Sequence, residues 1–288
     1  MQNFLIVGFG KVGSSLYRAM ATLNRFNILL LDAKKDFKEE WASFLPAHSF
    51  FRNIVNIRQK SFEFIAICTP DDRINETVSQ LQDFQLKNCA VFHTSGNKPA
   101  ELLNPLRDRG AHIGSLHPLQ TFNSMFLPPE VWQGITCTFQ GDTKLKDNLQ
   151  KIFDPLKTKI VPIDYQQKQL LHLVATISAN FQVALYSWAE QILKASGIEP
   201  PDLNTWLGPL IRQVSTNLNQ HPLSKILSGP LQRGDLNTLE DHLKLLKKYQ
   251  KAADIELYRL LCQKLLENLE FEIKDRQKLK NFLEHYET

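Results

Sequence analysis

The chain has 288 residues, of which 43% are hydrophobic and 22% are charged, a composition typical of a globular protein. This length favours two domains, because one hydrophobic core rarely grows beyond about 250–300 residues. The net charge of +4 comes from 34 basic and 30 acidic residues that are interleaved along the chain. We therefore expect no nucleic-acid partner, since binding arms carry blocks of like charge.

The cysteines and the N-terminus favour a cytoplasmic protein. Cys68, Cys89, Cys137 and Cys262 show no CxxC spacing, and a core of this size needs no disulfides. The first apolar run, Phe4 to Val7, is too short for an export signal and has no basic region before it. Motifs of zinc proteins, P-loop proteins and serine hydrolases are missing, so we predict no metal site.

The first half of the chain alternates short apolar runs with amphipathic stretches. The predicted strands are Asn3–Val7, Asn27–Leu31, Phe62–Cys68, Asn88–Phe92, His112–Leu116, Ile135–Phe139 and Lys159–Ile163. This pattern is typical of a doubly wound, mostly parallel sheet covered by helices. We therefore predict an α/β domain over residues 1–164.

A glycine-rich motif, Gly8-Phe9-Gly10-Lys11-Val12-Gly13, directly follows the first predicted strand and directly precedes the predicted helix Ser14–Leu23. In a GxGxxG motif the first glycine permits a tight turn, the second lets a pyrophosphate approach the backbone, and the third lets helix and strand pack closely. The helix N-terminus then offers N–H groups to the phosphates. The motif in this context predicts a Rossmann domain that binds a dinucleotide through these six residues.

Two further positions bear on the cofactor. Asp32 closes the second strand, where a carboxylate accepts hydrogen bonds from the adenosine ribose, and this favours NAD. Lys34 and Lys35 follow at once and leave NADP open, because they could hold a 2′-phosphate. Thr69 and Pro70 follow the third predicted strand, where they either contact the cofactor or begin a helix.

Two loops at strand ends carry the candidate chemistry. His93-Thr94-Ser95-Gly96 and His117-Pro118 end successive strands, and ligands of such sheets bind outside the carboxyl ends of the strands. We expect Thr94 and Ser95 to contact the cofactor and His117 to exchange a proton, with an ordinary pKa of about 6.5. The alternative for each histidine is a hydrogen bond within its own loop.

The second half shows helical periodicity in Gln166–Ala195, Asp202–Asn219 and Leu239–Glu284, with breaks at Gly197, Pro200-Pro201 and Gly229-Pro230. Asp235 or Asn237 is predicted to cap the helix that follows Gly234. We therefore predict an all-helical domain over residues 165–288.

The segment Gln169–Ala189 lacks charged residues, yet it contains polar groups that are costly in lipid, His172 and Asn180 among them. We expect a helix buried between domains or subunits, no membrane association, and a homodimer. Lys168, His172, Thr176 and Asn180 recur every four residues along it. This row either lines a cleft, with His172 and Asn180 as catalytic partners of His117, or is satisfied by neighbouring helices.

Five segments together resemble a known family: GFGKVG, HTSG, GSLHPLQTF, HLVATISANFQVAL and SGPLQRGDLNTLEDHL. They are similar to bacterial Rossmann-like proteins whose C-terminal half is a domain of unknown function 2520, related to pyrroline-5-carboxylate reductase and 6-phosphogluconate dehydrogenase-like enzymes. The resemblance implies an NAD(P) oxidoreductase whose helical domains dimerise around the cleft, and it implies no substrate.

The order of the loops is also similar to that of prephenate dehydrogenase, which implies substrate and catalytic contacts for Ser95 and His117. A glycine expected soon after the His-Pro pair is missing, however. Lys168 and Asn180 lie too far apart to match the Lys-to-Asn pair of hydroxyacid dehydrogenases, so that pair is not transferred.

The resulting hypothesis is hydride transfer between a nicotinamide and a small carbonyl, imine or alcohol substrate. His117 is the acid/base candidate, with Ser95 orienting substrate or nicotinamide. The alternative is a non-catalytic NAD(P)-binding sensor or scaffold, since a fold alone does not prove chemistry. An enzyme needs two or more polar side chains within reach of the nicotinamide, and a sensor does not.

Overall fold

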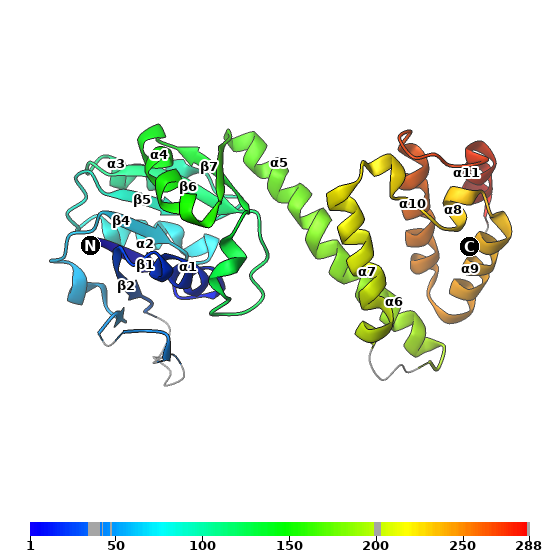
Figure 1. Cartoon of the computed structure of the whole chain (residues 1–288), viewed down its shortest axis with the longest axis horizontal. Helices are drawn as coiled ribbons and strands as arrows, with labels where there is room; N and C mark the ends of the chain where they lie inside the picture. The colour runs from blue at the N-terminus through cyan, green and yellow to red at the C-terminus, as the bar shows by residue number, and fades with distance from the viewer. Residues whose placement is uncertain (34–40, 42, 47, 199–202, 287–288) are drawn as a thin grey trace. The chain divides into compact units, whose positions relative to one another are not determined.

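A computed structural model of the chain describes residues 1–33, 41, 43–46, 48–198 and 203–286. The chain divides into two compact units, Met1–Asn180 and Phe181–Thr288 (Figure 1). Lys34, Lys35 and the break at Pro200-Pro201, all singled out in the sequence, lie outside the described residues.

Within its described residues, the first unit is built on an eight-stranded sheet in the order β3-β2-β1-β4-β5-β6-β7-β8. The strands are β1 (Gln2–Val7), β2 (Phe26–Leu31), β3 (Phe50–Phe51), β4 (Phe64–Ile67), β5 (Ala90–His93), β6 (His112–Pro118), β7 (Thr136–Gly141) and β8 (Lys159–Pro162). Neighbouring strands are parallel except β6 and β7, which are antiparallel. The predicted mostly parallel α/β fold is confirmed.

Helices cover both faces of this sheet. Phe4 and Ile6 of β1 belong to one apolar cluster, together with residues of α1 (Lys11–Thr22) and α4 (Thr143–Phe153). Leu5 and Val7 belong to a second cluster, with residues of α2 (Ile74–Leu81) and α3 (Asn104–Arg107). Successive side chains of a strand point to opposite faces, so a strand covered on both sides is a continuous apolar run.

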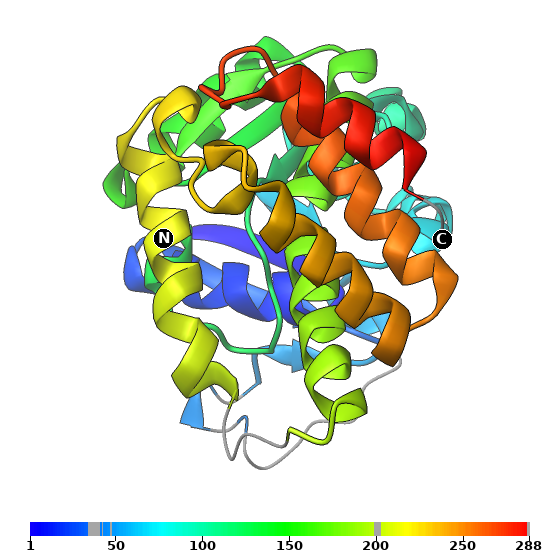
Figure 2. The same ribbon diagram turned by 90° about the vertical axis from the view of Figure 1, so that its right-hand side faces the viewer.

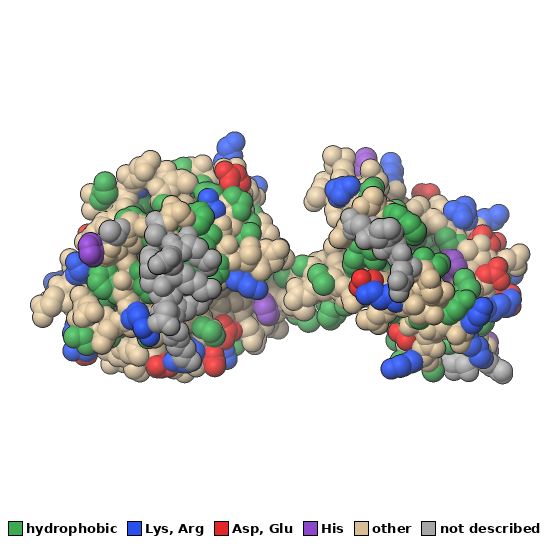
Figure 3. Space-filling model, turned by 90° about the horizontal axis from the view of Figure 1, so that it is seen from below, with side chains coloured by type: hydrophobic (Ala, Val, Ile, Leu, Met, Phe, Trp, Pro, Cys, Tyr) green, Lys and Arg blue, Asp and Glu red, His purple; other side chains and the backbone are tan. Residues whose placement is uncertain are grey.

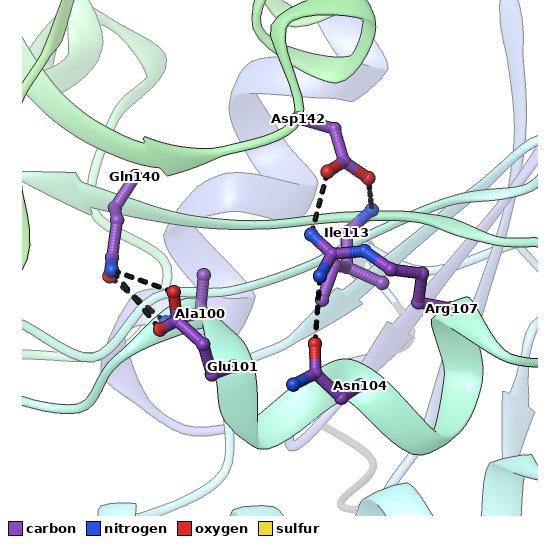
Figure 4. Close-up of polar contacts among 7 residues, drawn as sticks. All are labelled: Ala100, Glu101, Asn104, Arg107, Ile113, Gln140 and Asp142. Carbon is purple, nitrogen blue, oxygen red and sulfur yellow. Dashed lines mark hydrogen bonds and ion pairs between the residues drawn. The ribbon is translucent and has the colours of Figure 1, made fainter.

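A cluster of polar side chains lies beside the antiparallel pair β6 and β7 (Figure 4). Asp142 follows β7, and its carboxylate accepts a hydrogen bond from the Ile113 N–H at 2.8 Å and an ion pair from Arg107 at 2.7 Å. The Gln140 side chain accepts a hydrogen bond from the Ala100 N–H at 3.0 Å. These bonds tie the end of β7 to the start of β6 and to the segment that precedes it.

The second unit is helical. Its described helices are α6 (Phe181–Ala195), α7 (Leu203–Gln220), α8 (Pro230–Arg233), α9 (Leu236–Tyr249), α10 (Ala252–Glu267) and α11 (Arg276–His285). Helix α10 packs against both α9 and α11, as Figure 2 shows. The core of the unit includes Leu239, Leu243, Ile255 and Leu279.

The predicted cap of the helix after Gly234 is Asp235. Its carboxylate accepts a hydrogen bond from the Thr238 N–H at 3.1 Å, which satisfies a backbone donor in the first turn of α9. The predicted helical stretch Leu239–Glu284 is divided into three helices, because the backbone is extended at Gln250 and Asn268.

One continuous helical stretch links the sheet to the second unit. Helix α5 (Tyr165–Ala175) passes through a π-helical segment, Thr176–Asn180, into α6. The predicted domain boundary after residue 164 falls at the start of α5, whereas the compact units meet after Asn180. Helix α5 belongs to the first unit, and its buried Lys168 donates hydrogen bonds to the Ser95 carbonyl oxygen and the Ser115 hydroxyl of that unit.

Candidate functional site

The strand order reverses at β1, which has β2 on one side and β4 on the other. Such a reversal opens a crevice at the carboxyl ends of parallel strands. A cavity of about 890 Å³ lies there, lined by residues of the loops after β1, β2, β3, β4 and β5, by the end of β6 and by His172 of α5. All lining residues belong to the first unit.

The glycine-rich loop after β1 forms one wall of this cavity. Gly8 has a positive φ of 94°, and a Cβ on it would lie 2.7 Å from the backbone of Cys68 and Thr69. A Cβ on Gly13 would lie 2.1 Å from the Gly8 carbonyl oxygen. A Cβ on Gly10, by contrast, would meet no described heavy atom within 4 Å, and Gly10 lines the cavity. The first and third glycines are needed for packing, and the second leaves the backbone open to a ligand.

Asp32 holds this loop from the neighbouring strand. One of its carboxylate oxygens accepts a hydrogen bond from the Phe9 N–H at 2.9 Å, and Asp32 also lines the cavity. The Phe9 side chain is fully buried among aromatic rings that include Trp41 and Phe50. Phe9 therefore supports the loop from inside.

The other predicted cofactor residues, Lys11, Val12, Thr69, Pro70, Thr94 and Ser95, all line the cavity. The Thr69 hydroxyl oxygen is buried and has no hydrogen-bond partner among the described residues. Buried polar groups are normally paired, so a missing partner points to water or a ligand. The open face of Gly10 and the unpaired Thr69 hydroxyl fit a dinucleotide whose pyrophosphate lies over the glycine-rich loop. The contacts themselves stay predictions.

Ser95 organises its own loop. Its hydroxyl donates to Asp71 at 2.8 Å and accepts from the Asn97 and Lys98 N–H groups at 3.2 and 2.9 Å. The Ser95 N–H donates to His93, whose other ring nitrogen lies 3.1 Å from the Pro99 carbonyl oxygen. All bonding positions of this hydroxyl are thus occupied. A direct contact from Ser95 to a ligand stays a prediction.

The structure brings His117 and His172 together at the cavity, with their ring centroids 5.7 Å apart. Both rings lie against Gly96: a Cβ there would be 2.7 Å from Nε2 of His117 and 2.6 Å from Nδ1 of His172. Nδ1 of His117 is buried without a hydrogen-bond partner among the described residues. Burial, and then the charge of Lys168, lower the pKa of His117 to about 4. The ring is therefore neutral throughout the neutral pH range, where a histidine with the ordinary pKa of about 6.5 is partly charged.

Asn180 does not join these residues, because it is not among the described residues that line the cavity. It lies eight residues beyond His172, or roughly 12 Å along the helix at about 1.5 Å per residue. The π-helical segment from Thr176 to Asn180 also ends the four-residue repeat on which its prediction rested. A catalytic role for Asn180 thus has no support from its position in the first unit.

Lys168 was singled out in the sequence only as a member of the polar row, and no role at the site was expected of it. Only 1% of it is exposed, and its Nζ donates to the Ser95 carbonyl oxygen and the Ser115 hydroxyl, both at 2.6 Å. Burial lowers the pKa of Lys168 from 10.5 to about 8, while the nearby Asp71 carboxylate raises it. The signal in the sequence was a single lysine at the start of an otherwise uncharged helical segment.

Two family models match the chain. A Rossmann-like domain covers residues 3–118, and a domain of unknown function, DUF2520, covers residues 135–265. The chain joins a Rossmann-like domain to a DUF2520 domain. This confirms the resemblance inferred from the sequence. No curated protein matches the chain.

Solved structures share the fold of this chain at low sequence identity. A Bacteroides fragilis protein provisionally described as an NADP oxidoreductase is 20% identical, with a TM-score of 0.73 over 91% of this chain and 97% of its own. An imine reductase from Myxococcus stipitatus in complex with NADP⁺ is 13% identical, with a TM-score of 0.62 over 98% and 99%. Prephenate dehydrogenase from Aquifex aeolicus, in complex with hydroxyphenyl propionate and NAD⁺, is 16% identical, with a TM-score of 0.57 over 98% of each chain.

The buried Lys168 predicts a pH-dependent stability. Because its pKa is about 8 in the folded protein and 10.5 in the unfolded chain, the unfolded chain binds more protons between these values, and the free energy of unfolding rises with pH there. The rise is on the order of 3 kcal/mol, since one pH unit corresponds to about 1.4 kcal/mol. Urea unfolding of wild type and Lys168→Met at pH 7 and pH 10.5 checks this. From pH 7 to pH 10.5 the free energy of unfolding of the wild type should rise relative to that of the variant. If both change with pH by the same amount, the pKa of Lys168 is not lowered by folding.

Proposed function

We propose that this protein is an NAD(P)-dependent oxidoreductase that transfers a hydride to or from a small carbonyl, imine or alcohol substrate. One observation carries the proposal: a single cavity has the open glycine-rich loop on one wall and the neighbouring rings of His117 and His172 on another. The NADP⁺ and NAD⁺ complexes of the imine reductase and the prephenate dehydrogenase, which share this fold, support it.

Residues along the cavity would hold the cofactor. The backbone at Gly8 and Gly10, with the N-terminus of α1, would hold the pyrophosphate, and Asp32 would accept hydrogen bonds from the adenosine ribose. Thr69 and Thr94 would contact the nicotinamide half of the cofactor. They lie in the loops after β4 and β5 and line the same cavity as His117 and His172. The bound cofactor would supply the hydride donor or acceptor.

His117 would exchange the proton that accompanies hydride transfer. During oxidation the neutral imidazole would accept the proton that the alcohol or amine releases as its hydride leaves, and during reduction the imidazolium would return that proton to the carbonyl oxygen or imine nitrogen. Pro118 favours an extended backbone at His117, which fixes the position of the ring. Lys168 acts as a positioning residue: it holds the Ser95 carbonyl and Ser115 and lowers the pKa of His117.

Cofactor binding provides the first experiment on this proposal. Calorimetric titration of the protein with NADH and with NADPH should show saturable binding of at least one of the two cofactors. Either ligand at about one hundred times its Kd should also stabilise the protein by roughly 2.7 kcal/mol. A folded protein that binds neither would refute the proposal.

The helical half is proposed to form a homodimer. Exposed apolar side chains gather on α5, α6, α7 and the π-helical segment, namely Leu170, Leu173, Val174, Ile177, Phe181, Val183, Leu185, Trp206, Leu210, Ile211, Val214 and Leu218. Figure 3 shows hydrophobic side chains at the surface of the helical stretch that links the two units. By length and composition alone, Tyr165–Ala195 could also cross a membrane. A homodimer would cover these faces without a membrane, in line with the cytoplasmic location expected from the sequence.

Val183→Glu should convert the dimer to a monomer. Val183 is 71% exposed on α6 in the single chain, so a carboxylate there costs the fold little, but its burial in an interface core is costly. Leu269→Glu, at a residue 84% exposed outside the helices, is the matched control and should leave the dimer intact. Sedimentation velocity at micromolar concentration measures both. A well-folded wild-type monomer would refute the dimer.

A further inference from the structure

The edge of the cavity beside Asp32 carries a second charged residue, Arg52. Strands β2 and β3 are parallel, with Leu31 opposite Phe51, so Asp32 and Arg52 leave neighbouring strands at the same level. The Asp32 N–H donates to the Phe51 carbonyl oxygen at 3.0 Å, which keeps the two strand ends together. Neighbouring strands lie about 4.8 Å apart, so both side chains start from the same edge of the cavity, and both line it.

The backbone around Arg52 is fixed on both sides. The residue before it is in β3, and the residue after it, Asn53, caps a short 3₁₀ helix by accepting a hydrogen bond from the Val55 N–H at 3.0 Å. Asn53 and Ile54 also line the cavity. The Arg52 side chain therefore starts from a defined backbone position at the adenosine end of the proposed cofactor site.

Other described cations that line the cavity serve other parts of it. Lys11 lies at the start of α1, beside the loop that would hold the pyrophosphate. Arg73 follows β4 and is paired with Glu76 at 2.6 Å. Among the described cations that line the cavity, Arg52 is the one that follows β3, the strand beside Asp32.

The two charges at this edge select different groups on the ribose. The Asp32 carboxylate suits a free 2′-hydroxyl, which donates a hydrogen bond, but repels a 2′-phosphate. A guanidinium matches a phosphate with two parallel hydrogen bonds and offsets that repulsion. Because one Asp32 oxygen is already held by the Phe9 N–H, part of the carboxylate's role is to fix the glycine-rich loop.

We infer that Arg52 binds the 2′-phosphate of NADP and so sets the cofactor preference of this protein. The inference rests on the proposed function and adds to it the residue that discriminates between the two cofactors. It places the determinant after β3, whereas the sequence pointed to Lys34 and Lys35 after β2.

Calorimetric measurement of NADPH and NADH binding to Arg52→Ala tests the inference without a turnover assay. The loss of a charge-assisted pair should weaken NADPH binding about tenfold or more and leave NADH binding within about twofold. The matched control is Arg58→Ala, which removes a nearby exposed arginine that pairs with Asp83 and does not line the cavity. It should change neither affinity.

A second pair of probes isolates the phosphate. Adenosine 2′,5′-bisphosphate should bind wild type more tightly than adenosine 5′-monophosphate, and Arg52→Ala should remove the difference. Asp32→Asn, which keeps an acceptor for the Phe9 N–H, should weaken NADH more than NADPH. Equal losses of both cofactors in Arg52→Ala, or a wild type that gains nothing from the 2′-phosphate, would overturn the inference. The latter result with intact NADH binding leaves the proposed function standing, whereas binding of neither cofactor overturns both.

Discussion

Replacement of Gly10 by valine is expected to abolish NAD(P)H binding while the protein stays folded. A Cβ on Gly10 meets no described atom within 4 Å, and φ at this residue lies outside the left-handed region, so the loop can hold a side chain. That side chain would occupy the space proposed for the pyrophosphate. We expect the affinity to fall about 100-fold or more, a loss of roughly 3 kcal/mol. Calorimetric titration measures the affinity, and thermal unfolding measures the fold.

Two other glycines serve as controls for this experiment. Gly13→Val should lower the unfolding temperature strongly, because its Cβ would overlap the Gly8 carbonyl oxygen at 2.1 Å. Gly208→Ala, on α7 of the second unit, should affect neither binding nor folding, since its Cβ meets only the end of the Arg212 side chain at 3.3 Å. Wild-type affinity in a folded Gly10→Val protein would mean that the dinucleotide does not bind over this loop.

His117→Ala is expected to lower turnover by at least about a hundredfold, the lower end for a lost acid or base, with cofactor affinity nearly unchanged. The ring lies at the cavity beside His172 and Gly96, whereas His93 is fully buried and bonded within its loop. His112→Ala is the matched control, because His112 begins β6 at the far end of the sheet from the cavity. Steady-state kinetics and cofactor titration measure both effects.

The pH profile gives a second readout for His117. Its pKa of about 4 keeps the ring neutral throughout the neutral range, so activity that needs the neutral ring should be flat from pH 6 to 8 and fall as the pH approaches 4. A His117→Ala variant with full turnover would remove His117 from the mechanism. Loss of cofactor affinity in parallel with turnover would assign it to cofactor binding instead.

The sequence predicted the sheet well because its strands are buried on both faces and form uninterrupted apolar runs, such as Phe4 to Val7. The short strand Phe50–Phe51 was missed, since two residues carry no periodic pattern. The glycine-rich loop was also predictable, because steric demands on glycine are local to the backbone.

The remainder of the site depends on contacts between distant segments. The Lys168 side chain reaches Ser95, 73 residues earlier, and Ser115, 53 residues earlier, and no local pattern encodes such pairs. Burial of the His117 ring and the nearby charge of Lys168 lower the pKa of His117, and the His-Pro motif alone does not indicate this shift. The expected alignment of Asn180 with His172 assumed a regular α-helix, and the π-helical segment that ends at Asn180 interrupts that spacing.

The central claim, that this protein catalyses hydride transfer in the cavity at the carboxyl ends of the parallel strands, is tested most directly by a screen of small carbonyl, imine and alcohol compounds. Each compound is incubated with the protein and reduced or oxidised NAD or NADP, and the nicotinamide absorbance is followed. We predict that at least one compound gives turnover with wild type, that Gly10→Val abolishes it, and that His117→Ala lowers it by at least about a hundredfold. Turnover that survives both substitutions, or tight cofactor binding without turnover on any compound, would contradict the claim.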